Sequence, residues 1–214
     1  MRSLVKLVSI SPDAEKTIVY CARVSSSDQD NPNIAKLLKY CIKHGHWSVF
    51  ETAHVTIEVS TSRAISAQIL RHRSLTFQEF SQRYQSVDNS GVVIYAARRQ
   101  DSKDRQGSID DLPEATKDEW ELRQLENWKT SFEHYKWALD NGVAKECARF
   151  VLPLATSTRM YLSGNIRSFI HYIQSRDFGT GTQVEHSEIA AQIKQILIPH
   201  FPNTSEALEW TIQK

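Results

Sequence analysis

The densest group of polar side chains that could carry chemistry lies in one stretch of the chain: Gln68-Ile69-Leu70-Arg71-His72-Arg73-Ser74-Leu75-Thr76-Phe77-Gln78-Glu79-Phe80-Ser81-Gln82-Arg83-Tyr84. Gln68 and Arg71 are three residues apart, so on a helix they share a face. Arg71 to Arg73 would then lie at the end of that helix, where cations interact favourably with the helix dipole. Ser81 and Arg83 would point to the same side of an extended segment. A hydroxyl beside a guanidinium is a sound contact for phosphate.

The same residues have a plainer explanation. Basic side chains also close the last turn of helices on solvated surfaces, with no ligand involved. Ser81 could be taken for a nucleophile, but no adjacent His–carboxylate pair is evident to activate it. We therefore interpret Ser81 as a ligand of a phosphate or a base.

Composition favours one soluble domain spanning residues 1–214. The formal net charge is only +1, so no global field favours nucleic acid or an anionic membrane, and we expect neither partner. No signal-peptide core or membrane-spanning run is present in the sequence. Cys21, Cys41 and Cys147 are widely spaced without a CxxC pair. They predict free thiols in the cytoplasm, and no metal site.

The hydrophobic pattern predicts an α+β fold, a single domain with a small, mostly antiparallel sheet and several helices. We expect strands at Leu4–Ile10, Ala53–Val59 and Val92–Ala96. We expect helices at Ile34–Lys43, Ser62–Arg71, Glu119–Asp140, Ala144–Val151, Asn165–Ser175, Glu185–Ile198 and Ser205–Ile212, with Asn165 as the N-cap of its helix.

Two further patterns concern the long helix and the loops. One apolar stripe is predicted along Glu119–Asp140, made by Leu122, Leu125, Trp128, Phe132, Tyr135 and Leu139. Ser25–Pro32 reads as a loop, and the charged segment Arg98–Pro113 as a mobile one. The sequence contains no GxGxxG and no P-loop motif.

Several motifs together resemble one family. Arg71-His72-Arg73, seven further residues and then Ser81 resemble the RHR-x7-S signature of the flavin-dependent thymidylate synthases. Further resemblances to this family follow in the same order, at His44–Glu51, Ala148–Leu154, Asn165–Ser168, and Arg176 with Thr182–Glu185.

The resemblance implies roles for individual residues. Arg176 would be the catalytic residue, placed at the pyrimidine to favour its activated form. FAD, bound non-covalently, would contact Ser48, Arg71, His72, Arg73, Glu79, Asn165, Ile166, Arg167 and His171. The substrate dUMP would contact Gln68, Ile69, Leu70, Arg71, Glu79, Phe80, Ser81, Gln82, Arg83, Arg149 and Arg176.

The resemblance also implies the reaction and the assembly. Methylene would pass from methylenetetrahydrofolate to C5 of dUMP with NADPH as reductant, and a homotetramer would share its sites between subunits. Two alternatives stay open. One is a flavoprotein of the same fold that only oxidises NADPH, and the other is a non-catalytic nucleotide-binding module.

Some residues depart from the family pattern. Gln78 stands where we expect Asn, and His171 where Asn is frequent. The segment Asp177-Phe178-Gly179-Thr180-Gly181 replaces a shorter approach that contains a histidine. We therefore assign no role to a histidine at this point of the chain.

Overall fold

A four-stranded sheet forms the centre of the computed structural model, which describes residues 3–88, 91–179 and 181–211. The strand order is β1-β2-β6-β3, and every neighbouring pair is antiparallel. Its strands are β1 (Leu4–Ile10), β2 (His54–Ser62), β6 (Ser157–Asn165) and β3 (Thr76–Glu79). The predicted α+β class with a small antiparallel sheet is confirmed.

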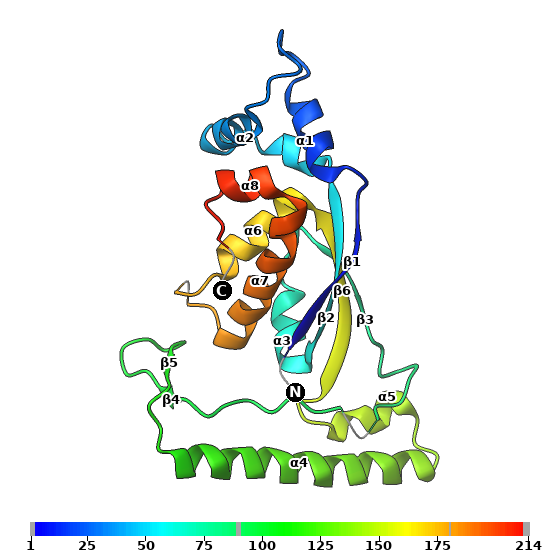
Figure 1. Cartoon of the computed structure of the whole chain (residues 1–214). Coiled ribbons are helices and arrows are strands. Elements are labelled where there is room, and N and C mark those ends of the chain that lie inside the picture. Colours follow the sequence, from blue (N-terminus) through cyan, green and yellow to red (C-terminus); the bar gives the residue numbers. More distant parts are fainter. Residues whose placement is uncertain (1–2, 89–90, 180, 212–214) are drawn as a thin grey trace.

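Alternating side chains give the sheet one apolar face. Val55, Ile57 and Val59 of β2 and Met160 and Leu162 of β6 are buried. Three helices cover this face (Figure 1), and they are α3 (Arg63–Ile69), α6 (Ile166–Arg176) and α7 (Val184–Leu197). Burying each large apolar side chain stabilises the fold by about 1.5–3 kcal/mol. The packing of these helices on the apolar face of the sheet therefore forms the main hydrophobic core.

Short helices gather at one end of the sheet (Figure 1). They are α1 (Ala14–Ala22), α2 (Ile34–Lys43), η1 (Trp47–Glu51), η3 (Ile198–His200) and α8 (Pro202–Ala207). Glu15 of α1 accepts hydrogen bonds from the backbone N–H groups of Asn203 and Thr204 at 3.2 and 2.7 Å. A carboxylate at these N–H groups stabilises the start of α8 and joins the two ends of the chain.

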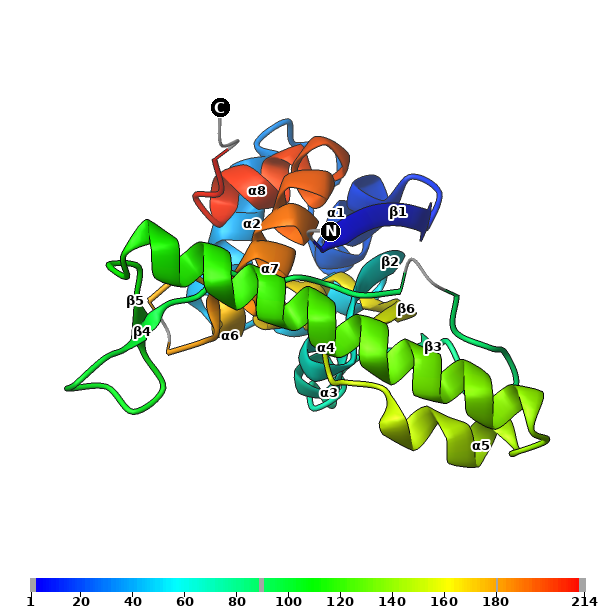
Figure 2. The same ribbon diagram turned by 90° about the horizontal axis from the view of Figure 1, so that it is seen from below.

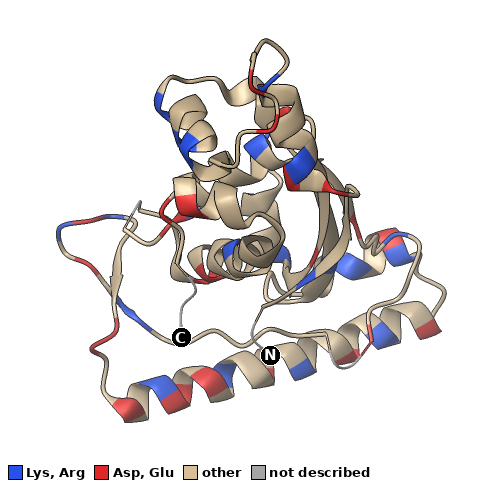
Figure 3. Ribbon diagram, turned by 45° about the horizontal axis from the view of Figure 1, so that its top comes forward, with Lys and Arg blue, Asp and Glu red and all other residues tan. Residues whose placement is uncertain are grey.

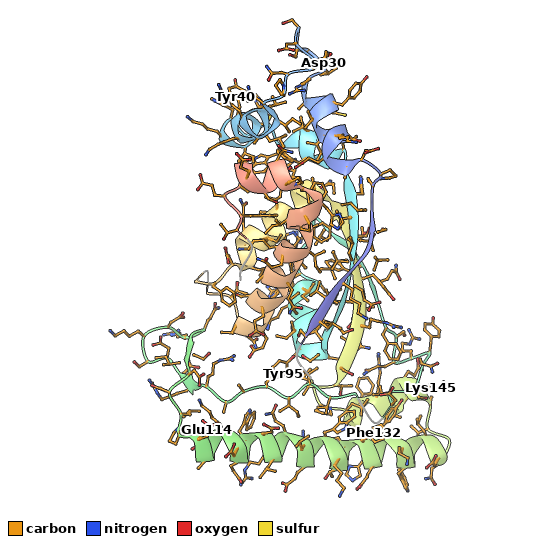
Figure 4. All side chains as sticks on the ribbon, in the orientation of Figure 1. Asp30, Tyr40, Tyr95, Glu114, Phe132 and Lys145 are labelled. Atoms are coloured by element: carbon orange, nitrogen blue, oxygen red, sulfur yellow. The ribbon has the colours of Figure 1, made fainter. Side chains whose placement is uncertain are left out.

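The long helix α4 (Glu114–Asp140) lies across the opposite end of the molecule (Figures 1 and 2). It packs on α5 (Lys145–Ala148) and η2 (Arg149–Val151). The C-terminal half of α4, which carries Phe132 (Figure 4), packs against Val87 and Ala148 in a second hydrophobic core. Trp128, Phe132, Tyr135 and Leu139 belong to that core, but Leu122 and Leu125 are 55% and 42% exposed. The predicted single stripe is therefore buried only over its C-terminal part.

The segment predicted to be a mobile loop, Arg98–Pro113, is anchored instead. It forms a hairpin from β4 (Arg99–Gln100) and β5 (Ser108–Ile109). Arg98 pairs with Glu185 at 2.6 Å, and Arg99 pairs with Asp111 at 2.5 Å. The first ion pair holds the segment against the rest of the chain and the second lies within the segment, which the high charge of the sequence did not indicate. Figure 3 shows acidic and basic residues alternating along the hairpin and α4.

Two predicted elements are wrong. Val92–Ala96 is not a strand, because only Val92 bridges to Thr156 while the backbone of Tyr95 bonds to the side chain of Gln124. The last helix begins earlier than Ser205, at Pro202, and ends at Ala207 before Glu209 turns to a positive φ of 59°. Ile212 lies outside the described residues.

The other predicted helices and the loop Ser25–Pro32 are confirmed, with shifts of a few residues at their ends. Sequence reasoning missed α1, β3 and β6. In β6 the buried residues Thr158, Met160 and Leu162 alternate with the less buried Arg159 and Tyr161. This period of two is the signal that predicts a half-buried strand.

Candidate active site

The first candidate site is a polar cavity of about 630 Å³, called here the arginine cavity. Gln68 reaches it from the last turn of α3, and Arg71 reaches it from the turn after the helix. The two residues therefore line one cavity as ligands of one site could, but they do not share a helix face as predicted, because α3 ends at Ile69. Arg176 reaches it from the end of α6. Its described lining residues are Gln68, Arg71, Gln106, Arg176, Gly181, Thr182, Gln183 and His186, and none of them is acidic. Two guanidinium groups without an acidic neighbour in the lining suit an anionic ligand.

Arg176 is the last residue of α6, whereas the sequence placed it after the helix. Its Nη1 donates to the backbone carbonyl of Ser175 at 3.0 Å. Its Nε is buried and has no hydrogen-bond partner within the described residues. A buried donor without a partner costs about 1–3 kcal/mol, so this guanidinium still has donor capacity for a ligand.

A buried aromatic group lies behind this cavity. The ring of Tyr172 is 5.2 Å from that of His72, and its hydroxyl lies 3.0 Å from Nε2 of His186. Burial lowers the pKa of His72, and the charges of His171 and Arg176 lower it further. Burial, then Arg176 and His72, lower the pKa of His186 to about 4. Both imidazoles are therefore neutral near pH 7, and Arg71 and Arg176 supply the positive charge on the described lining of the arginine cavity.

His72 differs from its two arginine neighbours. It is 7% exposed, whereas Arg71 and Arg73 are exposed. Its Nε2 lies 2.9 Å from the Ser74 hydroxyl, and its ring is 5.2 Å from that of His171. The middle residue of the motif thus packs inward, against Ser74 and His171, while its two arginine neighbours face outward.

A second cavity of about 610 Å³ lies at the start of α6 and is called here the Asn165 cavity. The Asn165 side chain accepts a hydrogen bond from the backbone N–H of Ser168 at 2.9 Å, which confirms the predicted N-cap. Arg167 forms an ion pair with Glu51 of η1. The described residues that line the Asn165 cavity are Trp47, Glu51, Ser74, Asn165, Arg167, Ser168, Ile170, His171 and Gln174.

This cavity brings together three of the residues predicted to bind a flavin, namely Asn165, Arg167 and His171. Ser48 is exposed on η1, between the lining residues Trp47 and Glu51. Ile166 has its side chain in the core, at 0% exposure, so only its backbone can face a ligand.

The donor set of the Asn165 cavity fits a flavin nucleotide. Arg167 lies in the first turn of α6, and its guanidinium is paired with Glu51 in this chain. A pyrophosphate can replace this carboxylate as the acceptor of the planar guanidinium. Trp47 and Ile170 supply apolar wall for a ring. The cavity therefore offers both kinds of surface that a dinucleotide cofactor needs.

A third group of predicted residues gathers around Glu146 of α5, and we call it the Glu146 cluster. Arg83 pairs with the carboxylate of Glu146 at 3.1 Å, and Nε of Arg149 donates to its backbone carbonyl at 3.3 Å. Ser81 accepts a hydrogen bond from the backbone N–H of Arg83 at 3.3 Å. The segment is a turn, with Tyr84 N–H bonded to the Ser81 carbonyl at 3.2 Å, and is not extended as predicted. The turn still keeps Ser81 and Arg83 together.

Glu79 is held beside this cluster by Arg63, a residue that the sequence did not single out. Arg63 contacts the Glu79 carboxylate at 3.0 Å, and Thr158 donates to the same oxygen at 2.9 Å. Arg63 also donates to the backbone carbonyl of Phe80 at 2.6 Å. Burial and the nearby Arg149 lower the pKa of Arg63, while Glu79 opposes them. Three arginines thus converge near the turn that carries Ser81.

The remaining predicted residues have mixed positions. Ile69 is in the core, and Leu70 is 41% exposed. Gln82 is buried, with its Nε2 lacking a partner among the described residues. None of the residues from Glu79 to Arg83, nor Arg149, lines the arginine cavity or the Asn165 cavity. The predicted ligands of one nucleotide are therefore divided between separate places on one chain.

Comparison with known proteins connects this geometry to a family. The family model described as "Thymidylate synthase complementing protein" matches residues 6–203. A flavin-dependent thymidylate synthase of Synechocystis sp. is 52% identical over 196 residues, covering 92% of this chain and 90% of the relative. The chain belongs to this family of flavin-dependent thymidylate synthases.

Two further proteins extend the comparison. A probable flavin-dependent thymidylate synthase of Paramecium bursaria Chlorella virus 1 is 51% identical over 199 residues, covering 92% of this chain and 91% of the viral protein. The crystal structure of the UMP/dUMP methylase PolB from Streptomyces cacaoi, bound with 5-Br dUMP, has a TM-score of 0.82 at 25% identity. That match covers 98% of this chain and 96% of the methylase.

The family motifs account for most of the cavity walls but not for all of them. Sequence reasoning assigned no role to Gln106, Gln183 or His186, which line the arginine cavity. Gln183 stands in a motif that was recognised, so its place could have been weighed. Gln106 lies in the charged hairpin, and no pattern in the sequence connects it with a site.

None of the helices formed by the described residues combines the length and the hydrophobicity that a membrane span requires.

Proposed function

We propose that this chain is a FAD-dependent thymidylate synthase that methylates dUMP reductively to dTMP. Methylenetetrahydrofolate would supply the carbon and NADPH the reducing equivalents. The observation that carries the proposal is the arginine cavity, where Arg71 and the under-bonded Arg176 face a space whose described lining contains no acidic side chain. A nucleotide monophosphate with an electron-poor base fits this charge pattern.

The chain's own residues would bind and polarise the nucleotide. Arg71, with Ser81, Arg83 and Arg149, would hold the phosphate, since each charge-assisted hydrogen bond contributes about 1.5–3 kcal/mol. Arg176 would stabilise negative charge as C5 of the uracil becomes nucleophilic. A guanidinium stays protonated, so Arg176 acts through its field and its hydrogen bonds and not as a base. The three cysteines of the chain take no part in this scheme.

The cofactor would lie along the Asn165 cavity. Arg167 and the amide of Asn165 would hold its pyrophosphate, with Ser48, His171 and the Arg71–Arg73 segment around it. When bound, FAD would supply the hydride chemistry, and the protein would supply orientation and electrostatics. We expect the enzyme to work in the cytoplasm, where thiols such as Cys21, Cys41 and Cys147 stay reduced.

We expect FAD to be bound without a covalent link, because Arg167, Asn165 and His171 form a polar cavity suited to reversible binding. Denaturing the purified yellow protein should release all of the flavin into the supernatant, measured by absorbance and chromatography. Colourless protein that takes up no added FAD would contradict this assignment.

The experiment that tests the function is tritium release from C5-labelled dUMP. Release that depends on methylenetetrahydrofolate and NADPH is expected, because C5 must exchange its hydrogen for the new carbon. NADPH oxidation without tritium release would instead support a flavoprotein oxidase of the same fold. Binding of dUMP with neither activity would support a nucleotide-binding module.

The proposal includes a homotetramer with sites shared between subunits. Its support is the division of the predicted dUMP ligands, with Arg71 and Arg176 in the arginine cavity and Arg83 and Arg149 in the Glu146 cluster. Further support comes from apolar side chains that this chain leaves exposed on and near α4. Trp120, Leu122, Leu125, Phe150 and Leu154 are between 42% and 80% exposed.

Light scattering of the purified protein should give a mass about four times that of the 24.5 kDa chain. Replacing Leu122 and Leu125 together by Gln should lower this mass, because polar side chains remove apolar contact area. The matched control replaces Lys16, which is exposed far from α4, by Gln, and should keep the parent mass. A monomeric parent with full activity would contradict the shared-site assembly.

A further inference from the structure

Four side chains form a continuous chain of polar contacts into the arginine cavity. Nη2 of Arg98 contacts Oε1 of Glu185 at 2.6 Å. Nε2 of Gln183 donates to the other carboxylate oxygen, Oε2, at 2.8 Å. Nε2 of Gln68 then donates to Oε1 of Gln183 at 2.7 Å. The chain of contacts runs from the start of the β4–β5 hairpin, through the beginning of α7, to α3.

The direction of these hydrogen bonds, from donor to acceptor, is fixed by the chemistry of Arg98 and Glu185. A guanidinium has donors only, and a carboxylate beside it has acceptors only. Gln183 must therefore turn its NH₂ group towards Glu185, which leaves its carbonyl oxygen facing Gln68. Gln68 must in turn present its NH₂ group to Gln183. A carboxamide that could flip freely in water is thus held in one orientation.

The ion pair at the start of this row of contacts is shielded from solvent, and the two glutamines at its other end face the cavity. The side chains of Arg98 and Glu185 are 17% and 10% exposed, whereas Gln68 and Gln183 both line the cavity. The hairpin that begins at Arg98 also contributes Gln106 to the same wall. A buried ion pair contributes little net stability, but it can select one arrangement of the groups around it.

We propose that Arg98 and Glu185 are positioning residues for the nucleotide, which act through Gln183 to fix the orientation of the Gln68 carboxamide in the arginine cavity. The inference rests on the proposed function in one respect, since the nucleotide is taken to be dUMP. Neither Arg98 nor Glu185 needs to touch the substrate. Their effect is on how a residue that does touch it is presented.

The first test uses Glu185→Gln and Gln183→Met in the full-length, FAD-loaded protein. Each should raise the dissociation constant and the KM for dUMP about tenfold, the value of one well-placed hydrogen bond. The kcat at saturating dUMP should stay within about twofold, since transition-state contacts are unchanged. Gln183 is exposed, so its substitution tests the idea even if Glu185→Gln folds poorly.

The double variant Glu185→Gln/Gln183→Met separates this role from simple structural support. If Glu185 acts through Gln183, the two losses should not add, and the double variant should also be about tenfold weaker. Losses that multiply to about a hundredfold would overturn the proposal. So would a dissociation constant for dUMP within twofold of the parent in both single variants.

A charge swap gives a second, independent test. Arg98→Glu with Glu185→Arg keeps an ion pair, but the arginine at position 185 has no acceptor for Gln183. The defect in dUMP binding should therefore persist, and recovery of parent affinity would show that the pair is only structural. Arg99→Met removes the exposed pair with Asp111 on the same hairpin and should leave dUMP binding unchanged.

Calorimetry with dUMP keeps this inference distinct from the function itself. A parent protein that binds dUMP but releases no tritium would refute the proposed reaction, while the variants still decide the positioning role. A parent protein that does not bind dUMP would refute both.

Discussion

Replacing Arg176 by Ala should lower the rate of thymidylate formation by roughly 100- to 1000-fold at saturating dUMP, the typical value of one preorganised donor at a developing charge. The physical reason is its position at the end of α6, with a buried Nε that has no partner among the described residues. Bound flavin and its reduction by NADPH should survive, because Arg176 does not line the Asn165 cavity. Single-turnover tritium release and flavin bleaching measure the two steps separately.

Arg176→Lys is the matched control for charge. A lysine keeps one positive charge but lacks the planar fork, so it should recover only part of the lost rate. If Arg176 merely closed the last turn of α6, both variants would form thymidylate within a few-fold of the parent rate. That result would remove Arg176 from the catalytic machinery.

Replacing Arg83 by Ala should weaken dUMP binding by about 2–4 kcal/mol, the value of one or two charge-assisted contacts. This corresponds to roughly a 30- to 700-fold larger dissociation constant. Flavin content should not change, since Arg83 lies in the Glu146 cluster and not in the Asn165 cavity. Calorimetry with dUMP and absorbance of bound flavin measure the two quantities.

Glu146→Ala is the control that the structure suggests. Arg83 and Glu146 are 58% and 53% exposed, so their ion pair contributes little to stability. Removing Glu146 leaves Arg83 available and should keep or strengthen dUMP binding. Equal losses in Arg83→Ala and Glu146→Ala would mean that the pair has a structural role. Lost flavin with unchanged dUMP affinity would mean that the ligands are reversed.

Sequence reasoning recovered the helices that carry the site because local patterns define them. The N-cap at Asn165 depends on neighbours within one turn, so it can be predicted directly from the sequence. Gln68 and Arg71 do line one cavity, but α3 ends at Ile69, so the helix face that they were expected to share does not extend to Arg71. The family motifs then proposed ligands, and the cavities bring several of them together. The dUMP and FAD roles remain predictions that the variants above would test.

Long-range pairing was the part that the sequence concealed. Glu185 pairs with Arg98, 87 residues earlier in the sequence, and Glu79 accepts a hydrogen bond from Thr158, 79 residues later. No local sequence pattern indicates such partners, so the hairpin was predicted to be a solvated loop. The strand β3 was missed for a related reason, since four residues with partial burial give only a weak alternation.

The position of β3 explains why seven residues separate Arg71-His72-Arg73 from Ser81. The seven residues between Arg73 and Ser81 contain the whole of β3, which pairs from Thr76 with Ser163 to Glu79 with Met160. Successive side chains on a strand face opposite sides, so one inserted residue would exchange the half-buried Phe77 and Glu79 with the exposed positions. It would also carry Ser81 about 3.3 Å along the sheet edge. The length of the spacer is therefore set by strand pairing. It fixes the distance from Arg71–Arg73 to the turn that carries Ser81, and it does not depend on the chemistry of the residues between them.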